Sequence, residues 1–192
     1  MRRIGLFALA LLLLEGPRAV AAQAAQPRAH ASLEASLAGS SVLESTVGFL
    51  GMAGLLSLDG RFSFGAGGSL MLGPTTVESD GAGSDLDLRL AYGGVLLQLK
   101  LVGSTDRYLA LRALVGAGNA KIEDTVYGLE IGADNFGVVE PEVVGMIPLA
   151  GPLGLGLGVG YRGVFGVDDV PGVGPSDLAG PSAKVRVSIR TN

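Results

Sequence analysis

The chain has 192 residues, of which 48% are hydrophobic and 32 are glycine, and its formal net charge is −4. This length fits one domain with a leader, and the negative charge argues against nucleic acid as a partner. The chain has no cysteine and only one histidine, His30, which argues against disulfides, thiol catalysis, a Ser-His-Asp triad and a cysteine or histidine metal site. We therefore expect no enzyme, no metal and no other cofactor.

The first 24 residues have the pattern of a secretory signal peptide. Arg2 and Arg3 precede an apolar run over residues 4–14, and small residues follow up to residue 24. A run of this length is too short for a membrane-spanning helix, which needs about 18 residues or more. We therefore predict a cleaved signal peptide at 1–24 and an exported protein, rather than an N-terminal membrane anchor. Later apolar segments are interrupted by glycines and charges, so none of them predicts a spanning helix.

After the leader, apolar residues recur at every second position, which is typical of β-strands with one apolar face. The first and weakest of these strands has Leu33 and Leu37 on its apolar side and Glu34 on its polar side. The alternation predicts eight strands, at about 31–39, 45–58, 61–72, 85–102, 107–121, 135–147, 153–161 and 182–190.

Two predicted strands contain an irregularity. In the strand at 85–102, leucines occupy even positions up to Leu90 and odd positions from Leu97 onward. We expect both sets of leucines to face the outside, with a β-bulge or a glycine bend at Gly93–Gly94. In the strand at 135–147, Pro141 cannot donate a backbone hydrogen bond, which predicts one missing bond in the sheet.

The strand at 153–161 has one apolar face and one face without side chains. Its large residues are Leu153, Leu155, Leu157, Val159 and Tyr161, and they alternate with Gly154, Gly156, Gly158 and Gly160. We predict that the large residues face lipid. The glycine row then faces the interior of a barrel and leaves room for long side chains from other strands.

The connections between the predicted strands alternate in length. Short turns at 59–60, 103–106 and 149–152 alternate with long loops, although the first connection, at 40–44, is short. Membrane β-barrels have short periplasmic turns and longer outer loops. The sequence therefore predicts an all-β fold, a closed antiparallel up-and-down barrel of about eight strands that occupies residues 31–192. A barrel of about eight strands has an interior just wide enough for side chains to fill.

The inward positions of this barrel carry charged side chains, which form our candidate site. They are Arg61, Asp87, Arg89, Lys100, Arg112, Glu140, Glu142, Arg162, Lys184 and Arg186. We interpret them as a barrel-interior charge network that fills the barrel, because buried charges must be paired. Two alternatives remain open: Glu140 and Glu142 beside basic residues are also suited to acid–base chemistry, or to lining a narrow ion path.

Five segments of the chain carry a resemblance to a known family. They are LRLAYGGVLLQLKL (88–101), RYLALRALVGAGNAKI (107–122), NFGVVEPEVVGMI (135–147), LGLGLGVGYRGVFGVD (153–168) and DLAGPSAKVRVSI (177–189). Glu-Pro-Glu at 140–142 and Gly-Tyr-Arg at 160–162 are the most distinctive. Together they resemble an uncharacterised group of small outer-membrane β-barrel proteins of Gram-negative bacteria. The resemblance covers the C-terminal half to two-thirds of the chain and implies a fold and an outer-membrane location, but no reaction.

Three functional hypotheses follow. The first is a non-enzymatic outer-membrane barrel with a structural or surface-binding role, whose partners are outer-membrane lipid and the barrel insertion machinery. The second is a small transport or ligand-binding barrel with a narrow pore. The third is a soluble periplasmic barrel, because the chain ends in VSIRTN where outer-membrane barrels usually end in an aromatic residue. A barrel enzyme that acts on lipid is disfavoured, since no histidine is placed to assist a serine.

Overall fold

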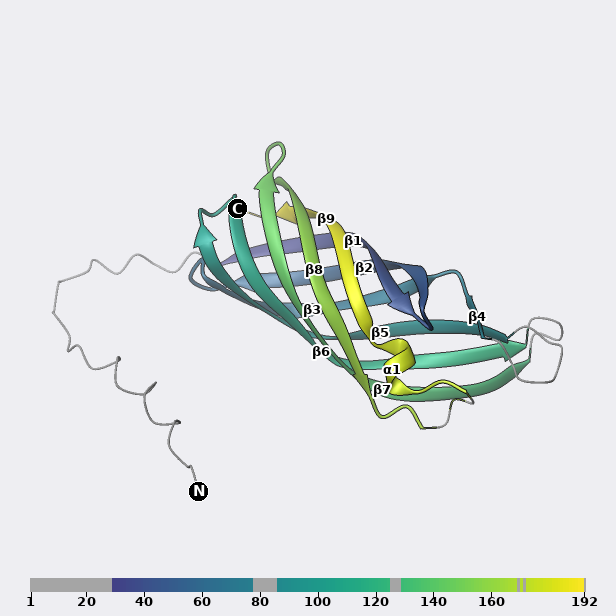
Figure 1. The fold of residues 1–192 in the computed structure, drawn as a ribbon. Helices are drawn as coiled ribbons and strands as arrows, with labels where there is room; N and C mark the ends of the chain where they lie inside the picture. Colours follow the sequence, from purple (N-terminus) through teal and green to yellow (C-terminus); the bar gives the residue numbers. More distant parts are fainter. Residues whose placement is uncertain (1–28, 78–85, 125–128, 169, 171, 192) are drawn as a thin grey trace, which may run out of the picture.

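The computed structural model describes residues 29–77, 86–124, 129–168, 170 and 172–191. In these residues, eight antiparallel strands form a closed barrel (Figure 1). The barrel strands are β1 (His30–Val42), β2 (Ser45–Ser57), β3 (Phe62–Leu72), β5 (Leu86–Gly103), β6 (Tyr108–Asp124), β7 (Glu130–Pro148), β8 (Leu153–Phe165) and β9 (Gly180–Arg190). They pair in the ring order β1-β2-β3-β5-β6-β7-β8-β9, and β9 pairs with β1 to close the ring. The predicted fold class is confirmed.

Some elements differ from the prediction. A short strand, β4 (Thr75–Val77), pairs with the start of β5, and a single helical turn, α1 (Pro175–Leu178), precedes β9. Strand β7 begins at Glu130, earlier than expected. The helix that the described residues contain is far too short to cross a membrane. The predicted signal peptide at 1–24 lies outside the described residues.

The two ends of the barrel differ. At the terminus end, where β1 begins and β9 ends, the connections are the short segments 58–61, 104–107 and 149–152. At the opposite end, the loop end, most connections are longer. The exception is the β1–β2 turn, where Leu43 and Glu44 both have positive φ, 49° and 60°. Two such residues in succession are typical of the tight turn that joins twisted hairpin strands, and this accounts for the short first connection.

Strands β5, β6 and β7 extend beyond the other strands at the loop end (Figure 1). Toward the loop end, the last residue of β5 that pairs with β3 is Ala91, and the last residue of β7 that pairs with β8 is Gly137. We call the sheet beyond these points, made of residues 86–91, 119–124 and 130–136, the loop-end extension. Its outer face is polar. Arg89 and Glu123 form one ion pair there, and Lys121 and Glu130 form a second.

The inner face of the extension is apolar and covers the loop end of the barrel. Residues 166–168, 170 and 172–179, which include α1 and which we call the cap, fold against this face. Buried side chains of the cap pack with buried side chains of the strands in one apolar cluster. From the cap come Val167, Val170, Val173 and Leu178, and from the strands come Phe49, Leu88, Leu90, Ile122, Phe136 and Val138, among others.

The expected bulge at Gly93–Gly94 is wrong. The pairing of β5 with β6 runs without a shift from Leu86 to Lys100, and the irregularity falls between Lys100 and Val102. Even-numbered side chains of β5 therefore point inward from Leu86 to Lys100, so Leu88 and Leu90 are buried rather than facing lipid. The leucines change sides because the surroundings change. At the loop end the inner face meets the apolar cap, whereas further down the outer face carries the leucines.

The prediction for Pro141 agrees with the strand pairing. Strand β7 keeps its pairing with β6 at this point, where Ala113 lies opposite Pro141. Its pairing with β8 skips from Val139 to Glu142. The interruption therefore falls on the β8 side of the strand, where the proline has no N–H to donate.

The outer wall of the barrel is apolar. Leu33, Met52 and Val159 are 68%, 73% and 63% exposed, and aliphatic side chains at outward positions of the other strands repeat the pattern. In the described part of the chain, no charged side chain points outward between the terminus-end turns and the loop-end extension. The wall is thus a continuous uncharged band.

The glycine row of β8 faces the interior, as predicted. A Cβ atom added at Gly158 would overlap the carboxylate of Glu142 and lie 3.1 Å from Nη2 of Arg186. On the outward side, Leu157 and Tyr161 are 61% and 53% exposed. The space over the glycines is therefore filled by side chains of the two neighbouring strands, β7 and β9.

We expect Gly158→Val to lower the free energy of unfolding by about 1–3 kcal/mol, because a side chain there displaces packed interior groups. The matched control is Gly145→Val, since the nearest atom to a Cβ at Gly145 is an oxygen 4.0 Å away. Urea unfolding of both variants in detergent or lipid measures the difference. Equal midpoints for the two variants would show that the glycine row is not needed for packing.

Candidate functional site

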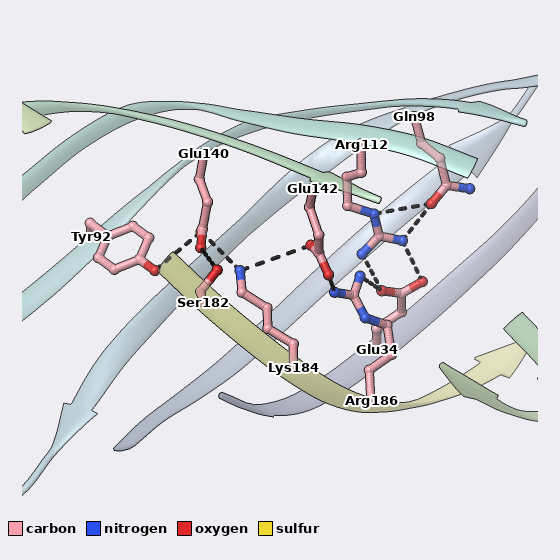
Figure 2. Close-up of polar contacts among 9 residues, drawn as sticks. All are labelled: Glu34, Tyr92, Gln98, Arg112, Glu140, Glu142, Ser182, Lys184 and Arg186. Atoms are coloured by element: carbon pink, nitrogen blue, oxygen red, sulfur yellow. Dashed lines mark hydrogen bonds and ion pairs between the residues drawn. The ribbon is translucent and has the colours of Figure 1, made fainter. Parts of the chain in front are cut away.

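The interior of the barrel is divided into layers along its axis. The apolar cluster under the cap lies at the loop end. A layer of charged side chains lies next to it, and a polar mouth lies at the terminus end. The charged layer contains half of the ten residues that the sequence pointed to, and we call it the charge network. Its members are Glu34, Arg112, Glu140, Glu142, Lys184 and Arg186, with Tyr92, Gln98 and Ser182 as neutral partners (Figure 2).

One half of the network is centred on Glu34 of β1. Arg112 of β6 binds both of its carboxylate oxygens, with Nη1–Oε2 and Nη2–Oε1 distances of 2.7 and 3.0 Å. The Oε1 atom of Gln98 accepts from Nε of the same guanidinium at 3.0 Å. Nη1 of Arg186 lies 3.6 Å from Glu34 Oε2. A carboxylate held in this fork-like way by one arginine is among the stronger pairings available to a protein.

The other half is centred on the two carboxylates of β7. Lys184 of β9 lies between them, with Nζ 2.8 Å from Oε2 of Glu140 and 3.9 Å from Oε2 of Glu142. Ser182 and Tyr92 donate their hydroxyl groups to Glu140 at 3.0 and 3.2 Å. Since Glu140 already accepts three hydrogen bonds, it has little capacity left to act as a general base. Its environment is that of a structural carboxylate.

The two halves are joined across the strand without side chains. Strand β8 separates β7 from β9 in the ring, and yet Glu142 of β7 forms an ion pair with Arg186 of β9. Both side chains pass over Gly158, which offers no Cβ to block them. The alternation within β7 and β9 points these residues inward, and the glycines of β8 let them meet.

The network is balanced in charge. Three carboxylates, those of Glu34, Glu140 and Glu142, face three cations, those of Arg112, Lys184 and Arg186. All six lie at or close to full burial. This balance satisfies the requirement that buried charges be paired.

Arg162 of β8 stands apart from the network. It is fully buried, and its guanidinium lies 4.7 Å from the ring centroid of Phe49 and 5.7 Å from that of Tyr92. Its Nε donates to the carbonyl of Leu178 at 2.8 Å, and its Nη2 donates to the carbonyl of Ser41 at 3.1 Å. Aromatic faces attract a cation, so Arg162 is held in place while it ties the cap to the end of β1.

The structure brings some of the predicted site residues together and separates others. Arg112, Glu140, Glu142, Lys184 and Arg186 lie in the network, and Arg162 is buried beside it. Lys100 lies in the terminus-end mouth. The remaining placements correct the expectation.

Arg61, Asp87 and Arg89 are not part of the interior network. Arg61 is exposed just before β3 begins. Arg89 lies on the outer face of the extension, where its Nε is 3.6 Å from Oε2 of Glu123, and Asp87 lies on the same strand at the same end. We assigned Asp87 and Arg89 to the interior because we expected Leu88 and Leu90, which alternate with them, to face outward. The same error therefore misplaced the charges and the leucines.

Four network members were missed from the sequence: Glu34, Tyr92, Gln98 and Ser182. Glu34 and Gln98 lie on the polar faces of their predicted strands. The alternation alone could therefore have placed both of them in the interior. Tyr92 continues the even-numbered series of Leu88 and Leu90, which we expected to face outward. No sequence pattern indicates that a tyrosine hydroxyl would reach Glu140.

The room left beside the network is small. A cavity of about 40 Å³ lies next to it, lined on one side by Ser36, Gly67 and Ser69. This space is enough for a few waters. Within the described residues, no three histidine, cysteine or carboxylate side chains are grouped so that they could hold a metal ion. The arrangement is suited to filling and cross-linking the barrel.

Comparison with known proteins identifies the fold. No protein-family model and no curated protein matches the chain. Neisserial surface protein A is similar in structure, with a TM-score of 0.59 and 10% identity over 84% of this chain and 96% of that chain. A major outer membrane protein from Thermus thermophilus is similar with a TM-score of 0.58 and 14% identity, over 85% of this chain and 100% of that chain.

A third similar structure is Ail, the attachment invasion locus protein of Yersinia pestis, in complex with the heparin analogue sucrose octasulfate. Its TM-score is 0.53 and its identity 10%, over 85% of this chain and 97% of that chain. At these identities the likeness shows the fold. The resemblance to small outer-membrane β-barrels is thereby confirmed at the level of architecture.

We expect Glu34→Gln to lower the free energy of unfolding by about 3–5 kcal/mol, because it leaves buried arginine charges without their carboxylate. The control is Glu123→Gln, which removes an exposed ion pair and is expected to change stability by less than about 1 kcal/mol. Denaturant unfolding in detergent measures both variants. A second substitution, Arg112→Gln, should recover part of the loss caused by Glu34→Gln. Equal, small effects at Glu34 and Glu123 would contradict the network's structural role.

Proposed function

We propose that the protein is a non-enzymatic barrel of the bacterial outer membrane with a structural or surface-binding role. The observation that carries the proposal is the uncharged apolar band around a closed ring of strands. A surface of this kind is unfavourable in water but matches the tails of lipids. The likeness to a neisserial surface protein and to an outer membrane protein of Thermus supports the proposal.

The dimensions of the barrel fit the same environment. Outside the loop-end extension, strands β1, β2, β3, β8 and β9 have 11 to 13 residues each. A tilted strand needs about 9–11 residues to cross a bilayer. We infer that the terminus end lies in the periplasm and the loop end outside the cell. The partners are then outer-membrane lipid and the barrel insertion machinery.

The filled interior favours a structural or surface role over transport. The charge network and the apolar cluster under the cap occupy successive layers of the barrel. An ion would have to displace both to pass. The narrow-pore hypothesis is therefore the weaker of the two, whereas the ligand-binding hypothesis retains one specific observation, the cavity at the terminus-end mouth.

The surface available for binding is the loop-end extension. Its outer face carries the carboxylates of Asp87, Glu123 and Glu130 beside two cations, Arg89 and Lys121. The structure of Ail contains a polyanionic heparin analogue. An excess of carboxylates does not favour such a ligand here, so a surface partner of this chain is expected to be neutral or basic.

Expression of the full chain followed by fractionation tests the location. We expect the protein in the outer-membrane fraction, with a gel band that migrates faster unboiled than boiled, because the closed barrel stays compact in detergent. In planar bilayers we expect no reproducible conductance steps. Recovery as a soluble periplasmic protein without a heat-dependent shift would sink the proposal. Regular conductance steps would favour the narrow pore instead.

A charge on the apolar band should be costly only if lipid covers it. We expect Leu157→Arg, at the middle of the band, to make folding into lipid vesicles less favourable by about 2–4 kcal/mol. The control is Ile131→Arg, at an exposed position of the extension, where the charge meets water and the expected change is within about 1 kcal/mol. An equal change in folding free energy for Leu157→Arg and Ile131→Arg would show that the band faces water rather than lipid.

A further inference from the structure

A second cavity lies at the terminus end of the barrel. Its volume is about 140 Å³, enough for several waters or one small molecule. Its lining includes Ser32, Ser63, Gln98, Lys100 and Tyr108, together with Arg190 near the end of the chain. This mouth lies away from the cap and meets the charge network at Gln98.

The cations of the mouth are not balanced. Arg190 donates from Nη1 to the carboxylate of Asp106 at 2.5 Å and to the carbonyl of Thr105 at 2.8 Å, so it already has an anionic partner. Nζ of Lys100 lies 4.6 Å from the ring centroid of Tyr108. Within the part of the chain that the structure describes, no carboxylate lies within ion-pair distance of Lys100. The carboxylate of Asp106 lines the same cavity but is held by Arg190, so two cations of the mouth share one carboxylate.

The floor of the cavity presents a hydrogen-bond donor. Gln98 is only 5% exposed, and its Oε1 accepts from Nε of Arg112. An arginine can only donate, so the carbonyl oxygen of Gln98 must face it. The amide nitrogen of Gln98 has two N–H bonds, of which one is used by Tyr108 and one is left for another partner. The hydroxyl groups of Ser32 and Ser63 line the same space.

We propose that this mouth binds a small oxyanion, a carboxylate or a phosphate, with Lys100 as its charged anchor. The hydroxyl groups of Ser32 and Ser63 and the amide of Gln98 supply neutral hydrogen bonds to the oxygens. A carboxylate or phosphate supplies the second negative charge that the two cations of the mouth lack, and it fits a space of this volume. The site goes beyond the proposed membrane role and does not depend on it, since binding can be measured in detergent.

The test is a titration of the ¹⁵N-labelled full chain in zwitterionic detergent micelles, followed by NMR. Sodium acetate and sodium phosphate are added separately at constant ionic strength, so the two arms distinguish the oxyanions. We expect saturable shifts confined to the signals of residues around the mouth, such as Gln98, Tyr108 and Arg190. Shifts that never saturate, or that spread over the whole barrel, would overturn the proposal without any variant.

Two lysine variants make the test specific. Lys100→Met should weaken binding about tenfold or more, the factor expected when one charge-assisted hydrogen bond is lost. Lys121→Met, at the opposite end of the barrel, should leave it unchanged. Lys100→Arg keeps the charge and should retain binding even if the methionine variant folds poorly. Equal affinity for the wild type and a folded Lys100→Met variant would show that Lys100 is merely solvated beside Tyr108.

Discussion

The ion pair between Glu142 and Arg186 connects two strands that are not neighbours in the sheet. Strand β8 lies between them, and the pair forms only because Gly158 leaves its inner face empty. From this bridge the network continues to Glu34 and Arg112, on strands farther around the ring. A single unpaired charge in this interior would be strongly destabilising, and the balanced set avoids that cost. The barrel is therefore held together from within as well as by its backbone ladder.

The sequence was informative where each face of a strand meets one kind of environment along its whole length. In β8, large side chains alternate with glycine, so both faces were assigned correctly. In β5, leucines occur on both faces, because the inner face packs under the cap while the outer face changes from polar to apolar. Alternation shows which residues share a face, but it does not show which face is inside when both are apolar. Arg89 and Leu88 were misassigned for this reason.

The sequence also did not show how deep along the barrel axis each inward residue lies. The sequence placed Arg162 and Lys100 on inward faces with Glu140, and both do face the interior or its mouth. Yet Arg162 lies under the cap, and Lys100 lies at the terminus end. The level at which a residue sits depends on strand register and on the tilt of the strands, and neither can be calculated from spacing within one strand. Only the paired strands decide which charges meet.

The closure between β1 and β9 joins the first and last barrel strands of the chain. Glu34 lies on the first barrel strand, while Lys184 and Arg186 lie on the last. Until β9 docks on both β8 and β1, the carboxylates of β7 lack their cations and two strand edges remain open. Open edges invite pairing with other chains, and unpaired interior charges disfavour a partial ring. A chain without β9 would therefore keep two open strand edges and unpaired carboxylates on β7. Pairing of β9 with both β8 and β1 removes both defects together.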